Sequence, residues 1–147
     1  MHVLVIGASG FVGRFVIDKL KRENVGRICR FVRKWSQSNE IRHNDVDKTS
    51  GDLTVISSIR EALKGKDALI NIAPLKYGFC ENLVRACEKE KIGRALFMST
   101  TAIFTQLRLQ EKRAILEAEK TITDSVIDYT IIRPTMIYGG WDDKNMY

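Results

Sequence analysis

The sequence predicts an α/β fold in which a doubly wound parallel sheet is covered by helices on both faces. Short apolar runs alternate with amphipathic helical patterns along the whole chain. Most of these runs are continuous, which is typical of parallel strands buried on both faces. The 147 residues contain no repeat and no linker, so we expect one domain over residues 1–147. Right-handed crossovers favour the strand order 3-2-1-4-5-6.

The first half of the chain supplies three strands and two helices. Residues 3–6 form an apolar run that predicts the first strand, and residues 10–23 place apolar side chains on one helical stripe. Residues 27–33 predict the second strand. A polar stretch follows, in which residues 41–46 are the best candidate for the third strand. Apolar residues at helical spacing then predict a helix over residues 55–63.

The second half continues the same alternation. Residues 68–73 are apolar except for one asparagine and predict a strand, while residues 80–87 carry apolar side chains at helical spacing. Residues 95–98 predict a strand and residues 113–123 a long helix. The aromatic and β-branched residues 129–132 predict the last strand.

Composition excludes several classes of protein. Cys29, Cys80 and Cys87 are too few for a disulfide framework, and His2 and His43 lie far from any cluster that resembles a metal site. No apolar stretch approaches the roughly 20 residues that span a bilayer, and the start of the chain does not resemble a signal peptide. We therefore expect a cytoplasmic protein with no metal. The net charge of +6 is compatible with a phosphorylated ligand.

The turn after the first strand carries the cofactor prediction. The turn contains three glycines. The first allows a sharp turn, the second lets the backbone approach a pyrophosphate closely, and the third lets the following helix pack tightly on the strand. The following helix directs its N–H groups and positive dipole end at the phosphates. A purely structural turn can look similar, but the position between a buried strand and an amphipathic helix favours a dinucleotide-binding Rossmann fold. The residues expected to bind there are Gly7, Ala8, Ser9, Gly10, Phe11, Val12 and Gly13.

The end of the second strand favours NADP, although NAD stays open. An acidic residue there would bind the ribose 2′-hydroxyl, whereas arginine accommodates a 2′-phosphate. No Asp or Glu occurs between Asn24 and Asn39, and Arg33 ends the strand with Lys34 or Ser36 beside it. The alternative is a solvated basic edge.

The same basic stretch contains aromatic residues, which superficially suits stacking on nucleic acid. Phe31 and Trp35 are interleaved with arginine and lysine there. Elsewhere the basic residues alternate with acidic ones, as they do over residues 111–120. Nucleic-acid binding is therefore disfavoured.

With these residues in view, the chain resembles the short-chain dehydrogenase/reductase superfamily. The similarity is to its extended and atypical branch, which includes nucleoside-diphosphate-sugar epimerase/dehydratase-like and NmrA-like NAD(P)-binding proteins. Several motifs in the right order make this far more specific than the glycines alone. They are residues 7–13 (GASGFVG), 31–33 (FVR), 51–54 (GDLT), 67–73 (DALINIA), 97–104 (FMSTTAIF) and 128–139 (DYTIIRPTMIYG).

The resemblance implies roles for residues at the strand ends. Thr100 falls where these families have their catalytic serine or threonine, and Thr135 and Met136 would pass near the nicotinamide. The residues that it places against the cofactor are Asp52, Leu53, Ile72, Ala73, Pro74 and Pro134, with the first two beside the adenine. Asp52 is also placed to cap the following helix, a compatible role.

The chain departs from the family's catalytic motif. Active members use a Tyr-x-x-x-Lys pair on the helix after the fifth strand, in which the tyrosine transfers the proton. No tyrosine occurs between Tyr77 and Tyr129, and Glu111 and Ile115 align with the two positions. Proton transfer by the usual tyrosine is therefore not expected.

The chain also lacks the substrate lobe that extended members place after the counterpart of Gly139. It is thus expected to be either a fragment or a cofactor-binding domain without that lobe. Two functions stay open: an NADP-dependent oxidoreductase or epimerase-like protein acting on an unknown small molecule, and a non-catalytic NADP(H)-binding sensor or scaffold. The helices near residues 78–90 and 113–123 correspond to those that pair subunits in many members, so a homodimer is expected.

Overall fold

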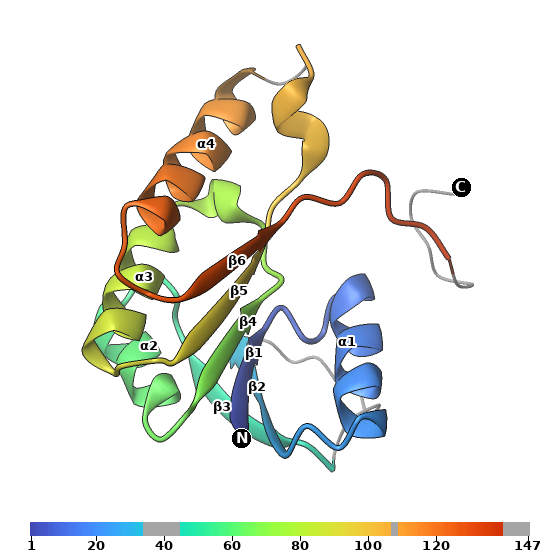
Figure 1. Cartoon of the computed structure of the whole chain (residues 1–147), viewed down its shortest axis with the longest axis vertical. Coiled ribbons are helices and arrows are strands. Elements are labelled where there is room, and N and C mark those ends of the chain that lie inside the picture. Colours follow the sequence, from blue (N-terminus) through green and yellow to red (C-terminus); the bar gives the residue numbers. More distant parts are fainter. Residues whose placement is uncertain (34–44, 107–108, 140–147) are drawn as a thin grey trace.

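The computed structural model describes residues 1–33, 45–106 and 109–139 of the chain (Figure 1). Its six strands form one parallel sheet in the order β3-β2-β1-β4-β5-β6, which confirms the predicted order. The strands are β1 (His2–Ile6), β2 (Arg27–Arg33), β3 (Asp47–Gly51), β4 (Ala68–Asn71), β5 (Arg94–Met98) and β6 (Tyr129–Ile132). At the centre of the sheet, Leu4 of β1 lies between Cys29 of β2 and Leu69 of β4.

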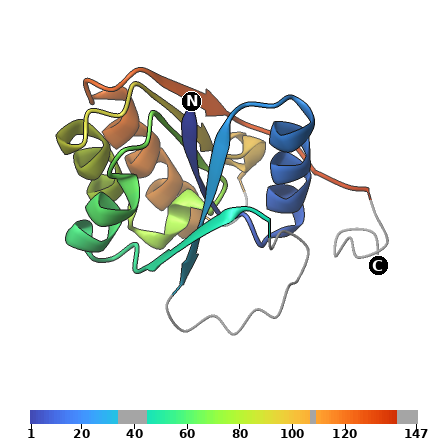
Figure 2. The ribbon, with the colours of Figure 1, turned by 90° about the horizontal axis from the view of Figure 1, so that it is seen from below.

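Helices cover both faces of the sheet, as predicted, but unequally. In Figures 1 and 2, α1 (Phe11–Arg22) lies on one face of the sheet, and α2 (Ile56–Leu63), α3 (Cys80–Lys89) and α4 (Leu109–Thr123) lie on the other. Because side chains alternate along a strand, β1 contributes to two cores. Leu4 and Ile6 pack in the larger core with α2, α3 and α4, whereas Val3 and Val5 pack in the smaller one with Ile17 of α1.

The predicted position of the third strand was wrong. Residues 41–44 of the predicted segment lie outside the described residues, and the strand observed is β3, which pairs with β2 at the edge of the described sheet. An edge strand needs no continuous apolar run, and Asp47 and Lys48 are both exposed. The strand ends at Gly51, where a Cβ atom would lie 2.8 Å from the Phe31 ring.

The long helix α4 begins at Leu109, one turn before the predicted start at Arg113. Residues 110–113 are polar, so the apolar periodicity does not reveal this first turn. Glu111 lies in that turn, where a carboxylate interacts favourably with the helix dipole.

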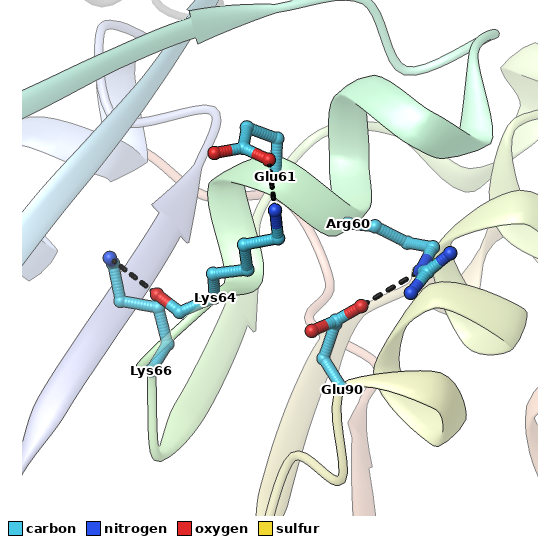
Figure 3. Close-up of polar contacts among 5 residues, drawn as sticks. All are labelled: Arg60, Glu61, Lys64, Lys66 and Glu90. Atoms are coloured by element: carbon cyan, nitrogen blue, oxygen red, sulfur yellow. Dashed lines mark hydrogen bonds and ion pairs between the residues drawn. The ribbon is translucent and has the colours of Figure 1, made fainter.

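Polar contacts at the surface join the end of α2 to the end of α3 (Figure 3). Arg60 Nε donates to Glu90 Oε1 at 2.7 Å, and Lys64 pairs with Glu61 at 2.5 Å. Lys66 Nζ donates to the Lys64 carbonyl at 3.3 Å. The Lys64–Glu61 pair is exposed and contributes at most about 1 kcal/mol, whereas the Arg60–Glu90 pair is partly buried. The packing of these helices therefore depends mainly on their apolar faces.

All three cysteines are free and buried. Burial raises the pKa of Cys80 and of Cys87 to about 12, and it also raises the pKa of Cys29. Because the thiolate is the reactive form, we expect iodoacetamide to label none of them in the native protein and all three after denaturation, as counted by mass spectrometry. Rapid labelling of the native protein would contradict this packing.

Candidate functional site at the carboxyl edge of the sheet

The turn after β1 has a shape that only glycine permits at two positions. Gly7 has φ +82°, and a Cβ there would lie 2.9 Å from the Ala73 backbone nitrogen. A Cβ on Gly13 would lie 2.1 Å from the Gly7 carbonyl oxygen. These contacts bring the first turn of α1 directly against the end of β1, and the end of β1 against the segment after β4.

The N-terminus of α1 is suited to an anion. Gly10 is its N-cap, with extended backbone and no side-chain cap, and the first turn contains no acidic residue. Gly10 N donates to the Gly7 carbonyl at 3.1 Å, while the first N–H groups of a helix have no partner within it. Together with the helix dipole, these groups fit the pyrophosphate of a dinucleotide.

Arg33 and Asp52 lie on the β2–β3 side of this edge. Arg33 is exposed at the last position of β2, beside Gly51 of β3, and Lys34 and Ser36 lie outside the described residues. Asp52 is also exposed.

The prediction that Asp52 caps α2 was wrong, because the N-cap is Val55. The Asp52 carboxylate instead accepts hydrogen bonds from Thr54 N at 2.8 Å and from Thr54 Oγ1 at 2.7 Å. These two hydrogen bonds keep the Asp52 carboxylate within the turn that precedes α2. Leu53 is half-buried against the larger core.

A pocket of about 750 Å³ occupies the other half of the edge, between the start of α1, the ends of β4, β5 and β6, and α4. Of the residues assigned from the sequence, those that line it are Phe11, Val12, Ile72, Pro74, Thr100, Pro134, Thr135 and Met136. The remaining ones, Gly7, Ala8, Ser9, Gly10, Gly13, Arg33, Asp52, Leu53 and Ala73, are not among its lining residues. The candidate site is therefore elongated, with the glycine turn, Arg33 and Asp52 along one half and the pocket at the other.

Thr100 follows β5 and is half-buried in the pocket wall. Its Oγ1 accepts a hydrogen bond from Ala102 N at 3.1 Å, at the start of the 3-10 turn η3 (Thr101–Phe104). Because a hydroxyl both accepts and donates, its hydrogen can be directed at a carbonyl oxygen in the pocket.

An ion pair that the sequence analysis did not identify joins α4 to the end of β6. Arg133 Nε and Nη2 donate to Glu119 Oε1 and Oε2 at 2.9 and 2.8 Å, and Glu119 is only 5% exposed. The hydrogen bond from Arg133 lowers the pKa of Glu119, although burial opposes this. The next residue, Pro134, accepts hydrogen bonds from Thr101 N at 3.0 Å and Thr101 Oγ1 at 3.2 Å. These hydrogen bonds connect three walls of the pocket, which are α4, the segment after β6 and η3.

The ionisable side chains of the pocket come from α4 and from the 3-10 turn η2 (Leu75–Tyr77). Lys76 Nζ lies 3.1 Å from Glu111 Oε2 and 5.6 Å from the centre of the Tyr77 ring. Lys112 Nζ donates to the Thr105 carbonyl at 3.2 Å. Lys76 and Tyr77 were missed in the sequence, although their place just after a predicted strand was a usable signal.

The two positions that align with the family's Tyr-x-x-x-Lys pair both reach this pocket. Glu111 and Ile115 are among its lining residues. The pocket therefore presents a carboxylate and an aliphatic side chain at the two positions that the sequence analysis aligned with the Tyr-x-x-x-Lys pair.

Two negative findings concern the described part of the chain. Residues 1–33, 45–106 and 109–139 contain no group of three His, Cys, Asp or Glu side chains placed to hold a metal ion. Within those same ranges, every helix is too short or too polar to cross a membrane.

Comparison with known proteins agrees with this geometry. A family model described as NAD(P)H-binding matches residues 7–145. The UPF0659 protein YMR090W of Saccharomyces cerevisiae is 28% identical, over 91% of this chain and 69% of its own length. A 2-alkyl-3-oxoalkanoate reductase of Shewanella oneidensis is 26% identical, over 69% of this chain but only 29% of its own length.

Solved structures share the fold. A short-chain dehydrogenase/reductase from Veillonella parvula superposes with a TM-score of 0.82 and 16% identity, covering 96% of this chain and 72% of its own. Its complex with NADP gives a TM-score of 0.78 over the same shares of the two chains.

Proposed function

Because the chain belongs to the NAD(P)H-binding family, within the short-chain dehydrogenase/reductase superfamily, we propose that it binds NADP(H) along the carboxyl edge of its sheet and serves hydride transfer to a carbonyl compound. The observation that carries this proposal is the continuity of that edge. The glycine turn, the start of α1 and Arg33 form one half, and the pocket at Thr100 forms the other. A dinucleotide is an elongated ligand with phosphates in the middle and reactive ring at one end, which matches this order.

The chain's own residues would orient the reaction, while the bound cofactor supplies the hydride. The Thr100 hydroxyl, which accepts a hydrogen bond from Ala102 N, would donate its own hydrogen to the carbonyl oxygen of the substrate. Phe11, Ile72 and Pro134 would provide an apolar surface against the nicotinamide and limit access of water. The name of the reductase from S. oneidensis describes a carbonyl substrate, which supports this reaction class.

The choice of NADP is tested by calorimetry with NADPH and NADH. We expect the wild-type protein to bind NADPH more tightly, because the Arg33 guanidinium would form charge-assisted hydrogen bonds to the 2′-phosphate. Arg33→Ala should weaken NADPH binding about tenfold or more and leave NADH binding nearly unchanged.

Arg27→Ala is the matched control, since Arg27 is an exposed arginine at the opposite end of the same strand. It removes the same charge and should leave both affinities unchanged. Tight binding of NADH that is indifferent to Arg33 would reject the NADP assignment. The absence of binding to either dinucleotide would reject the proposed function.

A second candidate is a sensor or scaffold that binds NADP(H) without turnover. It is favoured by one observation, the presence of Glu111 and Ile115 in the pocket where active members have the Tyr and Lys. Loss of NADPH absorbance on addition of 3-oxo acids or quinones would favour the enzyme. Stoichiometric NADPH binding with no consumption by any carbonyl acceptor would favour the sensor.

A further inference from the structure

The pocket at Thr100 has an apolar side and a charged side. Phe11, Val12 and Ile72 line it near the ends of β1 and β4. The charged side is formed by η2 and the first turn of α4. Every ionisable residue lining the pocket is on this wall: Lys76, Tyr77, Glu111 and Lys112. The charged side is connected to Thr100 by η3, which begins directly after Thr100 and is followed by Thr105, the residue whose carbonyl Lys112 contacts.

The charges on this wall do not balance. Lys76 faces Glu111 at 3.1 Å, so these two side chains compensate one another. Lys112 Nζ donates only to a neutral acceptor, the Thr105 carbonyl, and no carboxylate of the described segments lies within 4.0 Å of it. Lys112 is half-buried as a residue, and the contact of its ammonium group with the Thr105 carbonyl is exposed. An ammonium group that lines a pocket and has no carboxylate of the described segments beside it can form a charge-assisted hydrogen bond with an anion that enters the pocket.

We propose that Lys112 binds a carboxylate of the substrate, so that the pocket selects carbonyl compounds that are also acids. This inference rests on the proposed function and assigns the substrate class. The carboxylate would lie at Lys112 and the carbonyl oxygen at Thr100. Ile115 and the Tyr77 ring provide apolar contacts for the carbon chain on the same side of the pocket. Lys112 would act in selection of the substrate and not in proton transfer.

The test uses 3-oxooctanoate and its uncharged methyl ester as probes. Both are titrated by calorimetry into the protein, with and without saturating NADP⁺, a state in which the carbonyl group cannot be reduced. The wild-type protein is expected to bind the acid about tenfold more tightly than the ester, since a charge-assisted hydrogen bond contributes about that factor. Lys112→Met should abolish the preference, and Lys112→Arg should keep most of it.

Arg113→Met is the matched control, because Arg113 is the next residue of α4 and is exposed. It removes one positive charge without touching the pocket, and the preference for the acid should persist. Equal binding of acid and ester by the wild-type protein, or a preference that survives Lys112→Met, would overturn the carboxylate site. Failure of NADPH to bind would instead overturn the proposed function, so the two failures are distinguishable.

Discussion

Replacing Gly13 with valine is expected to destabilise the protein by about 3 kcal/mol or more, a large loss for one substitution. A Cβ at this position would lie 2.1 Å from the Gly7 carbonyl oxygen and 2.7 Å from two backbone atoms of Ala8. These are main-chain atoms at the end of β1, so the clash can be relieved only if α1 moves away from the sheet. Thermal unfolding followed by circular dichroism measures the loss, and NADPH binding should disappear with it.

Gly93→Ala is the matched control for this prediction. A Cβ at Gly93 would lie 3.4 Å from the Asp67 carbonyl, an ordinary contact, and the backbone there does not have positive φ. The unfolding free energy of Gly93→Ala should differ from that of the wild-type protein by less than about 1 kcal/mol. If Gly13→Val were as stable as the wild-type protein, the close packing of α1 on the turn would be refuted.

Glu119→Gln is expected to destabilise the protein by about 2 kcal/mol at neutral pH, since it removes the buried charged acceptor of two hydrogen bonds from Arg133. The effect should also depend on pH. The folded-state pKa of Glu119 lies below its ordinary value of 4.5. The stabilisation is therefore complete above that value and is lost as the pH falls through the lower, folded-state pKa.

The pH dependence is measured by urea unfolding of the wild-type protein and of Glu119→Gln between about pH 7 and pH 3. Their difference in unfolding free energy should shrink toward the acid end. Glu81→Gln is the control, because Glu81 forms an exposed pair with Arg85, in which both side chains are 62% exposed. It should have little effect at any pH. A constant difference between wild type and Glu119→Gln across this range would contradict the role of the ionised carboxylate.

Much of the fold could be predicted because its information is local. Apolar runs such as residues 3–6 and the helical stripe of α1 are visible without tertiary context. The crossover rule then fixes the strand order. The polar edge strand β3 and the first turn of α4 were misplaced, because neither buries enough apolar surface to leave a periodic pattern.

The site was predictable to the extent that it depends on strand ends. Parallel strands bring their carboxyl ends to one edge, so the glycine turn at Gly7 could be assigned to that edge from its position after the first strand. Ile72, Thr100 and Pro134 were assigned through the resemblance to the superfamily, and they line the pocket at the same edge. The Glu119–Arg133 pair could not, because it joins residues on different elements whose relative rotation is set only by packing. The charged wall around Lys112 could not be predicted either, because it brings together residues of η2 and α4, whose relative position is also set by packing.

The most direct test of the cofactor site is a titration of isotopically labelled protein with NADPH, followed by backbone amide NMR. The account predicts saturable shifts at Gly10, Gly13 and Ile72 and at Thr100, with little change on the surface of α2 and α3. Perturbations confined to the α2–α3 surface, or none at saturating NADPH, would contradict a dinucleotide site at the carboxyl edge of the sheet.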